Sequence, residues 1–176
     1  MEPLRSARIG IFAFFAIFAL LPFLSDAQEG ETSRIRFTTL SKSTPGGLRT
    51  DLVRDFTQDM GGYVWLATDQ GLSRFDGFRT VHYSHDPNRS DGLSSNQLTA
   101  LATLRRSKGP LWIGTSSNGL MKFNQETGAT TRFVRGAVKG AKLLSDHITD
   151  LDVSDEKFLW IGTDSGLNVL NLATEA

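Results

Sequence analysis

The chain contains three copies of one short phrase, and this repeat restricts the possible folds more than any other feature. The phrases are VWLATDQGL, LWIGTSSNGL and FLWIGTDSGL, and they hold the only three tryptophans, spaced 47 and 48 residues apart: Trp65, Trp112 and Trp160. Six or seven residues after each tryptophan comes a Gly-Leu pair, beginning at Gly71, Gly119 and Gly166. A period in the forties in strand-like sequence indicates repeated sheet units.

Each repeat unit is predicted to hold four short strands. In the second copy we expect them at Gln97–Thr103, Leu111–Thr115, Leu120–Phe123 and Thr130–Val134, which are rich in aliphatic, β-branched and aromatic residues. The glycine of each Gly-Leu pair supplies the positive φ or the close backbone approach of a tight hairpin. The residues around each tryptophan are apolar with little alternation, which is typical of a strand covered on both faces. We therefore expect the three tryptophans at equivalent, buried positions on the second strand of successive units.

Four strands and one aromatic signature per unit are the pattern of a β-propeller blade. A solenoid coil is shorter, about 20–30 residues per turn, and a sandwich has no reason to repeat a nine-residue phrase. The predicted fold class is all-β, a partial β-propeller of about three four-stranded blades after an N-terminal signal peptide. The third blade is incomplete, because the sequence stops one strand short. Closed propellers have about four to eight blades, so we expect a fragment of a longer protein or a truncated product.

The repeat register divides the chain into five segments. The predicted segments are a signal peptide at 1–27, a lead-in with an extra strand at 28–47, blade 1 at 48–91, blade 2 at 92–141 and the incomplete blade 3 at 142–176. The extra strand is expected at Ile35 to Leu40, where it would complete the last blade of a full ring.

The first 27 residues have the layout of a secretory signal peptide. Arg5 and Arg8 precede an apolar run from Ile9 to Leu24, and small residues at 25 and 27 precede Gln28. The alternative is a membrane anchor, but the run is shorter than the ~20 residues of a spanning helix. We expect cleavage before Gln28 and a periplasmic product. Because the chain has no cysteine, no disulfide or lipid attachment through cysteine is expected.

The charge balance argues against electrostatic capture of polyanions. Lys and Arg total 19, as do Asp and Glu, so no nucleic-acid partner is expected, and membrane association only through missing downstream segments. The sequence shows no catalytic constellation, and no cofactor is expected. A metal site is not expected either, since His82 and His85 lie three residues apart on extended chain without further ligands.

Short polar residues precede the first strand of each blade, at Asp51, Asn96 and Asp146. Propeller ligands commonly bind where loops from successive blades converge, so these three are the candidate ligand-binding residues. The alternative is structural, because Asp and Asn side chains bond the local backbone at turns.

The phrases resemble the two-component regulator propeller repeat, over about Leu40 to Ala176. The second copy carries the resemblance best, with Gly92-Leu93, Leu111-Trp112-Ile113-Gly114-Thr115, Gly119-Leu120 and Phe123. The first copy departs by having Ala67 in place of the glycine. The third has Lys142 in place of the entry glycine and Leu170 in place of the aromatic residue.

The resemblance implies the periplasmic sensor region of a hybrid histidine kinase or diguanylate cyclase. This chain would be its N-terminal part, recognising a small-molecule or glycan-derived ligand without catalysis, with the remaining blades of a longer chain as partners. Any kinase or cyclase output domain lies outside this sequence. Two alternatives remain open, a propeller-type carbohydrate-active enzyme and a plain protein-interaction scaffold.

Overall fold

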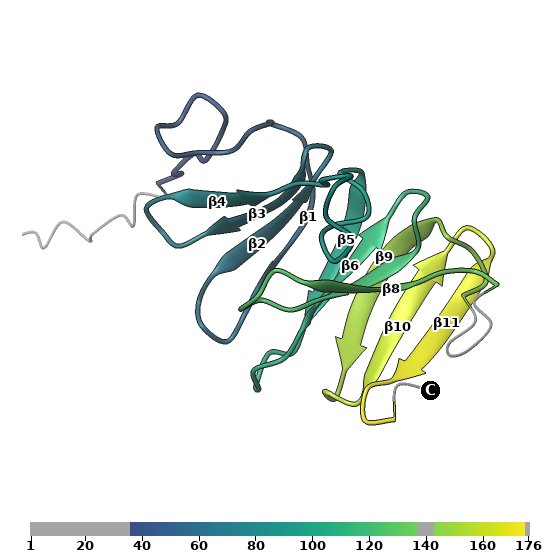
Figure 1. Ribbon diagram of the computed structural model, residues 1–176. Helices are drawn as coiled ribbons and strands as arrows, with labels where there is room; N and C mark the ends of the chain where they lie inside the picture. The colour runs from purple at the N-terminus through teal and green to yellow at the C-terminus, as the bar shows by residue number, and fades with distance from the viewer. Residues whose placement is uncertain (1–35, 137–142, 175–176) are drawn as a thin grey trace, which may run out of the picture. The chain divides into compact units, whose positions relative to one another are not determined.

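The computed structural model describes residues 36–136 and 143–174, and the residues from Thr38 onward form one compact unit. The predicted signal peptide, the start of the predicted extra strand at Ile35, and Lys142 lie outside the described residues. The described part consists of strands and turns (Figure 1). It contains no helix long and apolar enough to cross a membrane.

The strands form three antiparallel sheets that follow one another along the chain (Figure 1). The first sheet has the order β1-β2-β3-β4, with β1 Val53–Gln58, β2 Val64–Thr68, β3 Gly71–Phe75 and β4 Thr80–Tyr83. The second has the order β5-β6-β7-β8, with β5 Leu98–Thr103, β6 Leu111–Thr115, β7 Leu120–Phe123 and β8 Thr130–Phe133. The third has the order β11-β10-β9, with β9 Ile148–Ser154, β10 Phe158–Thr163 and β11 Gly166–Asn171.

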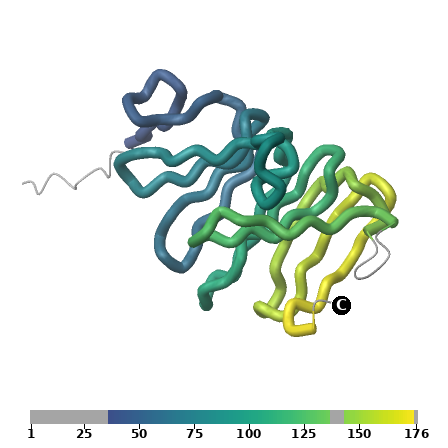
Figure 2. The backbone as a smooth tube through the Cα atoms, viewed as in Figure 1, coloured from purple at the N-terminus to yellow at the C-terminus, as the bar shows by residue number. Residues whose placement is uncertain are grey.

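This arrangement confirms the predicted all-β partial propeller. Each sheet is a meander in which consecutive strands pair (Figure 2), and β5 packs against the first sheet as β9 packs against the second. The third sheet has three strands within the described residues, as the sequence predicted. In the second sheet the bounds of β6 and β7 are those predicted, whereas β5 begins one residue later and β8 ends one residue earlier.

The repeated phrase produces the same local geometry in each sheet. The threonine that ends the second strand donates its hydroxyl to the carbonyl of the glycine in the following Gly-Leu pair. The donors are Thr68, Thr115 and Thr163, at 2.7, 2.7 and 2.8 Å from their acceptors. The first strand of each sheet also carries a β-bulge at the same repeat position, directly after Val53, Leu98 and Ile148. These shared bonds explain why the phrase recurs with threonine.

The apolar core consists of two clusters that lie between neighbouring sheets. Trp65 and Leu72 of the first sheet pack with Leu101, Ile113 and Phe123 of the second. The intervening positions of the second sheet face the other way, because side chains alternate along a strand. Those residues, Ala100, Ala102, Trp112 and Leu120, pack against the third sheet. The second sheet is therefore buried on both faces, as the apolar run around Trp112 predicted.

The expectation that all three tryptophans are buried is wrong for Trp160. Trp65 and Trp112 are 0% and 1% exposed, but Trp160 is 39% exposed. The register is nevertheless equivalent, since each tryptophan lies on the second strand, opposite Arg74, Lys122 or Val169 of the third strand. The difference arises because a following sheet covers the first two tryptophans, and no described residues form such a sheet over Trp160.

The predicted extra strand is not formed within the described residues. Residues 36–40 belong to no sheet, and the first strand of the described chain begins at Val53. Turns occupy much of the intervening segment, where Gly47 and Leu48 donate backbone hydrogen bonds to Thr44 and Ser41. A strand at residues 36–40 needs a neighbouring strand edge for its backbone groups, and the structure pairs them with none.

Candidate functional site

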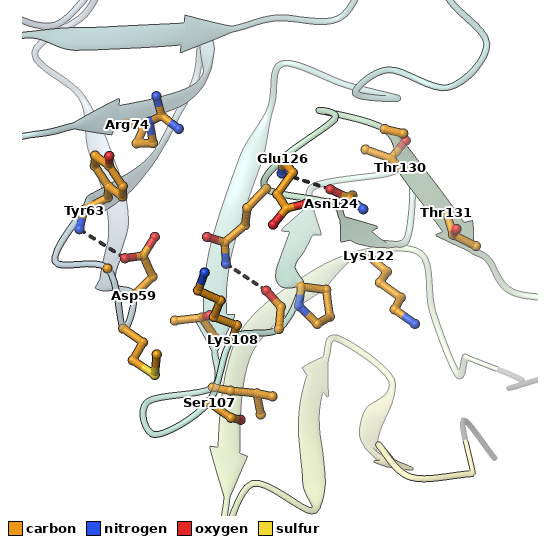
Figure 3. A pocket seen from close by; sticks show the side chains of 18 residues that line it. Asp59, Tyr63, Arg74, Ser107, Lys108, Lys122, Asn124, Glu126, Thr130 and Thr131 are labelled. Carbon is orange, nitrogen blue, oxygen red and sulfur yellow. Dashed lines mark hydrogen bonds between the residues drawn. The ribbon is translucent and has the colours of Figure 1, made fainter.

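A cleft opens between the first two sheets. It has a volume of about 860 Å³ and is lined by the β1–β2 hairpin, β3, the β5–β6 turn and the β7–β8 hairpin (Figure 3). The two sheets pack together at Trp65 and Leu101, and turns of both sheets line the cleft. The site is thus built from blades 1 and 2.

Asp59 anchors the blade 1 wall of this cleft. One of its carboxylate oxygens accepts a hydrogen bond from the backbone N–H of Tyr63 at 3.1 Å, and the other accepts from the indole Nε1–H of Trp65 at 2.7 Å. The β1–β2 hairpin is therefore tied to the buried tryptophan. In blade 2, Leu104 takes the register of Asp59, and the buried Nε1 of Trp112 has no partner among the described residues.

Arg74 is the most distinctive side chain of the cleft. Its guanidinium carbon lies 4.6 Å from the ring centroid of Tyr63 and 5.6 Å from that of Trp65, so cation–π contacts hold it in place. Among the described residues it forms no hydrogen bond or ion pair with a carboxylate or carbonyl. A held guanidinium with unused N–H donors suits a carboxylate, sulfate or phosphate group on a ligand.

The opposite wall comes from blade 2 and is polar. Gln125 donates its side-chain N–H to the carbonyl of Gly109 at 3.0 Å, which ties the β7–β8 hairpin to the β5–β6 turn. Asn124 accepts the backbone N–H of Glu126 at 2.9 Å (Figure 3). Lys108 is exposed in the β5–β6 turn and adds a second positive charge to the lining. The lining therefore combines cations, amides and hydroxyls with the carboxylates of Asp59 and Glu126.

A smaller cavity of about 360 Å³ lies along the first strands of the three sheets. Its lining includes Arg54, Thr99 and Thr149, which occupy the bulged position of β1, β5 and β9. Gln97 and His147, the neighbours of two predicted ligand-binding residues, also line it. This is the side on which the first strands of a propeller surround its central channel.

The structure assigns Asn96 and Asp146 a clear structural task. The backbone carbonyl of each accepts an N–H from the Gly-Leu glycine of the preceding blade, Gly71 or Gly119, at 3.0 and 2.9 Å. Their side chains accept a second backbone N–H from the preceding blade, from His85 at 2.7 Å and from Arg135 at 2.6 Å. These residues join successive blades.

Asp51 occupies the same repeat position but bonds the lead-in segment. Its Oδ1 accepts the backbone N–H of Lys42 at 2.9 Å, and its Oδ2 lies 3.6 Å from the Lys42 ammonium. Ligand binding by Asp51, Asn96 and Asp146 stays a prediction. They do not line the large cleft, whose residues Asp59, Tyr63 and Arg74 sequence reasoning did not select. The sequence feature that could have pointed to Arg74 is its position on the strand after Trp65, directly opposite that tryptophan.

The histidines make separate local contacts. The Nδ1 atom of His82 lies 2.9 Å from the hydroxyl of Ser73, and that of His85 lies 2.6 Å from the carbonyl oxygen of Leu93. His147 lies 3.5 Å from Asp164, whose carboxyl pKa is lowered mainly by a hydrogen bond from Ser145. No group of three or more potential metal ligands gathers among the residues in the two described ranges.

We predict that His82 makes the fold less stable in mild acid. Burial lowers the pKa of His82 below its usual value, and the positive charge of Arg49 lowers it further. Because the folded-state pKa is depressed, the contribution of His82 to the free energy of unfolding is fully present above the unfolded pKa of about 6.5. This contribution is lost as the pH falls through the folded pKa. The melting temperature should fall between pH 8 and pH 5.5, and the His82→Asn variant should fall less.

Carboxyl groups do not obscure this measurement. Asp76, Asp91 and Asp164 have lowered pKa values, so their contributions are lost below pH ~4. Equal decreases in the wild type and the His82→Asn variant over the same pH range would contradict the assignment to His82.

Comparisons with known proteins support the fold. Neither a family model nor a curated protein sequence matches the chain. Among solved structures, the extracellular domain of a protein named as a hybrid two-component system of B. thetaiotaomicron is 30% identical, with a TM-score of 0.63, and the match covers 74% of this chain and 18% of that one.

Two further solved structures share the fold at lower identity. One is the extracellular domain of a protein named as a one-component system of B. thetaiotaomicron, 20% identical, with a TM-score of 0.59 over 81% of this chain and 20% of that one. The other is PorZ, a bacterial surface component of the type-IX secretion system of Porphyromonas gingivalis, 18% identical, with a TM-score of 0.56 over 76% of this chain and 19% of that one. The chain thus spans about a fifth of the length of these structures.

Proposed function

We propose that this chain is the N-terminal part of an extracytoplasmic propeller that serves as the sensor region of a bacterial signalling protein and recognises a ligand without catalysis. The observation that carries the proposal is the 30% identity and shared fold with the extracellular domain of a hybrid two-component system. The repeat phrases, which resemble the two-component regulator propeller repeat, support the same assignment. The output domain would follow in the longer protein.

The N-terminal sequence supports a periplasmic location for this sensor. Arg5 and Arg8 followed by the apolar run to Leu24 form the layout of a cleaved leader. When the chain is expressed in a Gram-negative host, N-terminal sequencing of the periplasmic fraction should begin near Gln28. Recovery of a chain that begins at Met1 in the membrane fraction would instead identify an uncleaved anchor.

The cleft between blades 1 and 2 is the ligand site that the geometry supports best. Arg74 presents guanidinium donors, Lys108 adds charge, and Gln125 and Asn124 add amide groups at the opposite wall. Hydroxyls of Thr130 and Thr131 also line the cleft. These groups suit a saccharide that carries a carboxylate or sulfate, because its anionic group can pair with the guanidinium while its hydroxyls bond the amides. The proposed ligand class is therefore an acidic glycan fragment.

Calorimetric titration with uronic-acid and sulfated oligosaccharides tests this site, with neutral oligosaccharides of the same length as the reference. An acidic member should bind and its neutral counterpart should not. Arg74→Gln should weaken binding about ten- to hundredfold, because hydrogen bonds to charged groups contribute about 1.5–3 kcal/mol. Arg79→Gln is the matched control, since Arg79 lies in the same blade, outside the cleft, paired with Asp76 at 3.4 Å.

Each outcome separates the proposal from its alternatives. Recovery of the bound oligosaccharide unchanged after prolonged incubation supports a sensor, whereas shortened or unsaturated products would identify a carbohydrate-active enzyme. Equal weakening by Arg74→Gln and Arg79→Gln would contradict the assignment of the cleft. Failure of every acidic oligosaccharide to bind would contradict the proposed ligand class and leave the protein-interaction scaffold as the better account.

A further inference from the structure

The face of the third sheet that points away from the second sheet is apolar and open. It carries four large hydrophobic side chains, each at least 39% exposed: Phe158, Trp160, Leu167 and Val169. Strand β9 adds Asp150 and Asp152 to this face, opposite Gly162 and Trp160. The equivalent faces of the first two sheets are each covered by the next sheet, so this structure itself shows what kind of element fits such a face.

The contact between blades 1 and 2 includes one carboxylate that serves two strands. The Oδ1 atom of Asp55 accepts the N–H of Phe56 on its own strand at 2.7 Å. The Oδ2 atom accepts the N–H of Leu101 on β5 of the next blade at 2.6 Å. Leu101 depends on this acceptor because the residue before it is Ala100, which has no carboxylate.

Asp150 repeats this arrangement in blade 3 with one oxygen still unused. Asp150 lies opposite Gly162 as Asp55 lies opposite Ala67, which is the same repeat register. Its Oδ1 accepts the N–H of Leu151 on its own strand at 2.9 Å. Its Oδ2 accepts no hydrogen bond from the described residues, and the side chain is on the exposed face. The acceptor for a next strand is therefore already in place.

We propose that Asp150 docks the inner strand of a fourth blade, carried by the same polypeptide, by accepting a backbone N–H at the register of Leu101. The residue before that N–H has no carboxylate, as at Ala100. The fourth blade must also present a cationic or hydroxyl side chain to Asp152, because a carboxylate that is covered by a blade needs a partner. This inference rests on the proposed function in one respect, namely that the chain is part of a longer propeller.

A second copy of this chain fits the face less well. Its exposed inner strand is β1, where the N–H of Phe56 already bonds Asp55. Docking β1 onto β9 in the register of the blade 1–blade 2 contact brings the carboxylates of Asp55 and Asp150 together without a donor between them. Like charges at such a contact disfavour association.

An extended chain tests the docking. Asn171, the last residue of β11, has the repeat position of Asp76 in blade 1, because each lies two residues after the partner of the tryptophan, Val169 or Arg74. A copy of residues 77–136 joined after Asn171 therefore supplies an outer strand and then a blade of the blade 2 type. Trp160 should become protected from acrylamide quenching, and the added copy of Leu101 should exchange its amide hydrogen slowly. Asp150→Asn keeps an oxygen for Leu151 but removes the second acceptor, so that exchange should become at least about tenfold faster.

Two controls isolate the acceptor from general packing. Asp55→Asn in the same extended chain should accelerate exchange at Leu101 itself by a similar factor. A second extension uses residues 125–174, which add a blade of the blade 3 type. The inner-strand N–H of that blade is already bonded by its own copy of Asp150, and the two carboxylates repel each other, so this extension should protect Trp160 less than the first. Asp150→Asn should have little effect on exchange at that N–H.

The outcomes distinguish the inference from the proposal beneath it. Protection of Trp160 without an effect of Asp150→Asn would overturn the role of Asp150 and leave the longer propeller standing. Unchanged quenching of Trp160 in both extensions would overturn the docking of a further blade. Concentration-dependent dimerisation of the unextended chain that protects Trp160 would show that a second copy occupies the face and would also overturn the inference. None of these results depends on ligand binding at the cleft.

Discussion

Replacing Trp112 with alanine should reduce the free energy of unfolding by about 3–5 kcal/mol, whereas Trp160→Ala should reduce it by about 1–2 kcal/mol. Both residues occupy the same repeat position, but Trp112 is 1% exposed and packs between the second and third sheets, while Trp160 is 39% exposed. The cost of truncating a side chain follows the apolar area and the cavity left behind. Urea unfolding followed by circular dichroism measures both values.

Trp65→Phe provides a comparison within the buried class. Trp65 donates its indole N–H to Asp59, while the equivalent atom of Trp112 has no partner in the part of the chain that the structure describes. Trp65→Phe therefore removes a hydrogen bond to a carboxylate, whereas Trp112→Phe removes none. Trp65→Phe should thus be the more destabilising of these two variants. Equal losses from Trp112→Ala and Trp160→Ala would show that the blade 3 face is already covered in solution.

Gly119→Ala should be strongly destabilising, with a loss of about 3 kcal/mol in the free energy of unfolding. Gly119 has φ of +78°, and a Cβ atom there would lie 2.2 Å from the carbonyl oxygen of Phe133. Strand β8 must then move away from β7, with which it pairs through Leu120 and Phe133. The positive φ adds about 1–2 kcal/mol of strain for a residue with a side chain.

Gly77→Ala separates the strain from the clash. Gly77 also has a positive φ, of +98°, but a Cβ atom there meets nothing within 4 Å. Its loss should be limited to the strain, about 1–2 kcal/mol. Thermal melts of the two variants against the wild type measure the difference. If Gly77→Ala is as destabilising as Gly119→Ala, the close approach of β8 is not the reason for the glycine.

The repeat in the sequence was sufficient to predict the blades. The spacing of Trp65, Trp112 and Trp160 and the run of apolar residues around them encode strands through local alternation and turn chemistry. These interactions lie within one unit, so they can be recognised without knowing the neighbours. The same holds for Gly119, whose turn joins β6 to β7.

Only the tertiary structure decided which repeat positions are buried and which form a site. Trp160 has the same sequence environment as Trp112 but no covering sheet among the described residues. Asn96 and Asp146 bond backbone groups of a preceding blade, and Arg74 and Gln125 line opposite walls of a cleft formed by two units. Such contacts join residues tens of positions apart, because they depend on how one sheet packs against the next. A periodic pattern specifies each sheet, but burial and binding arise between sheets.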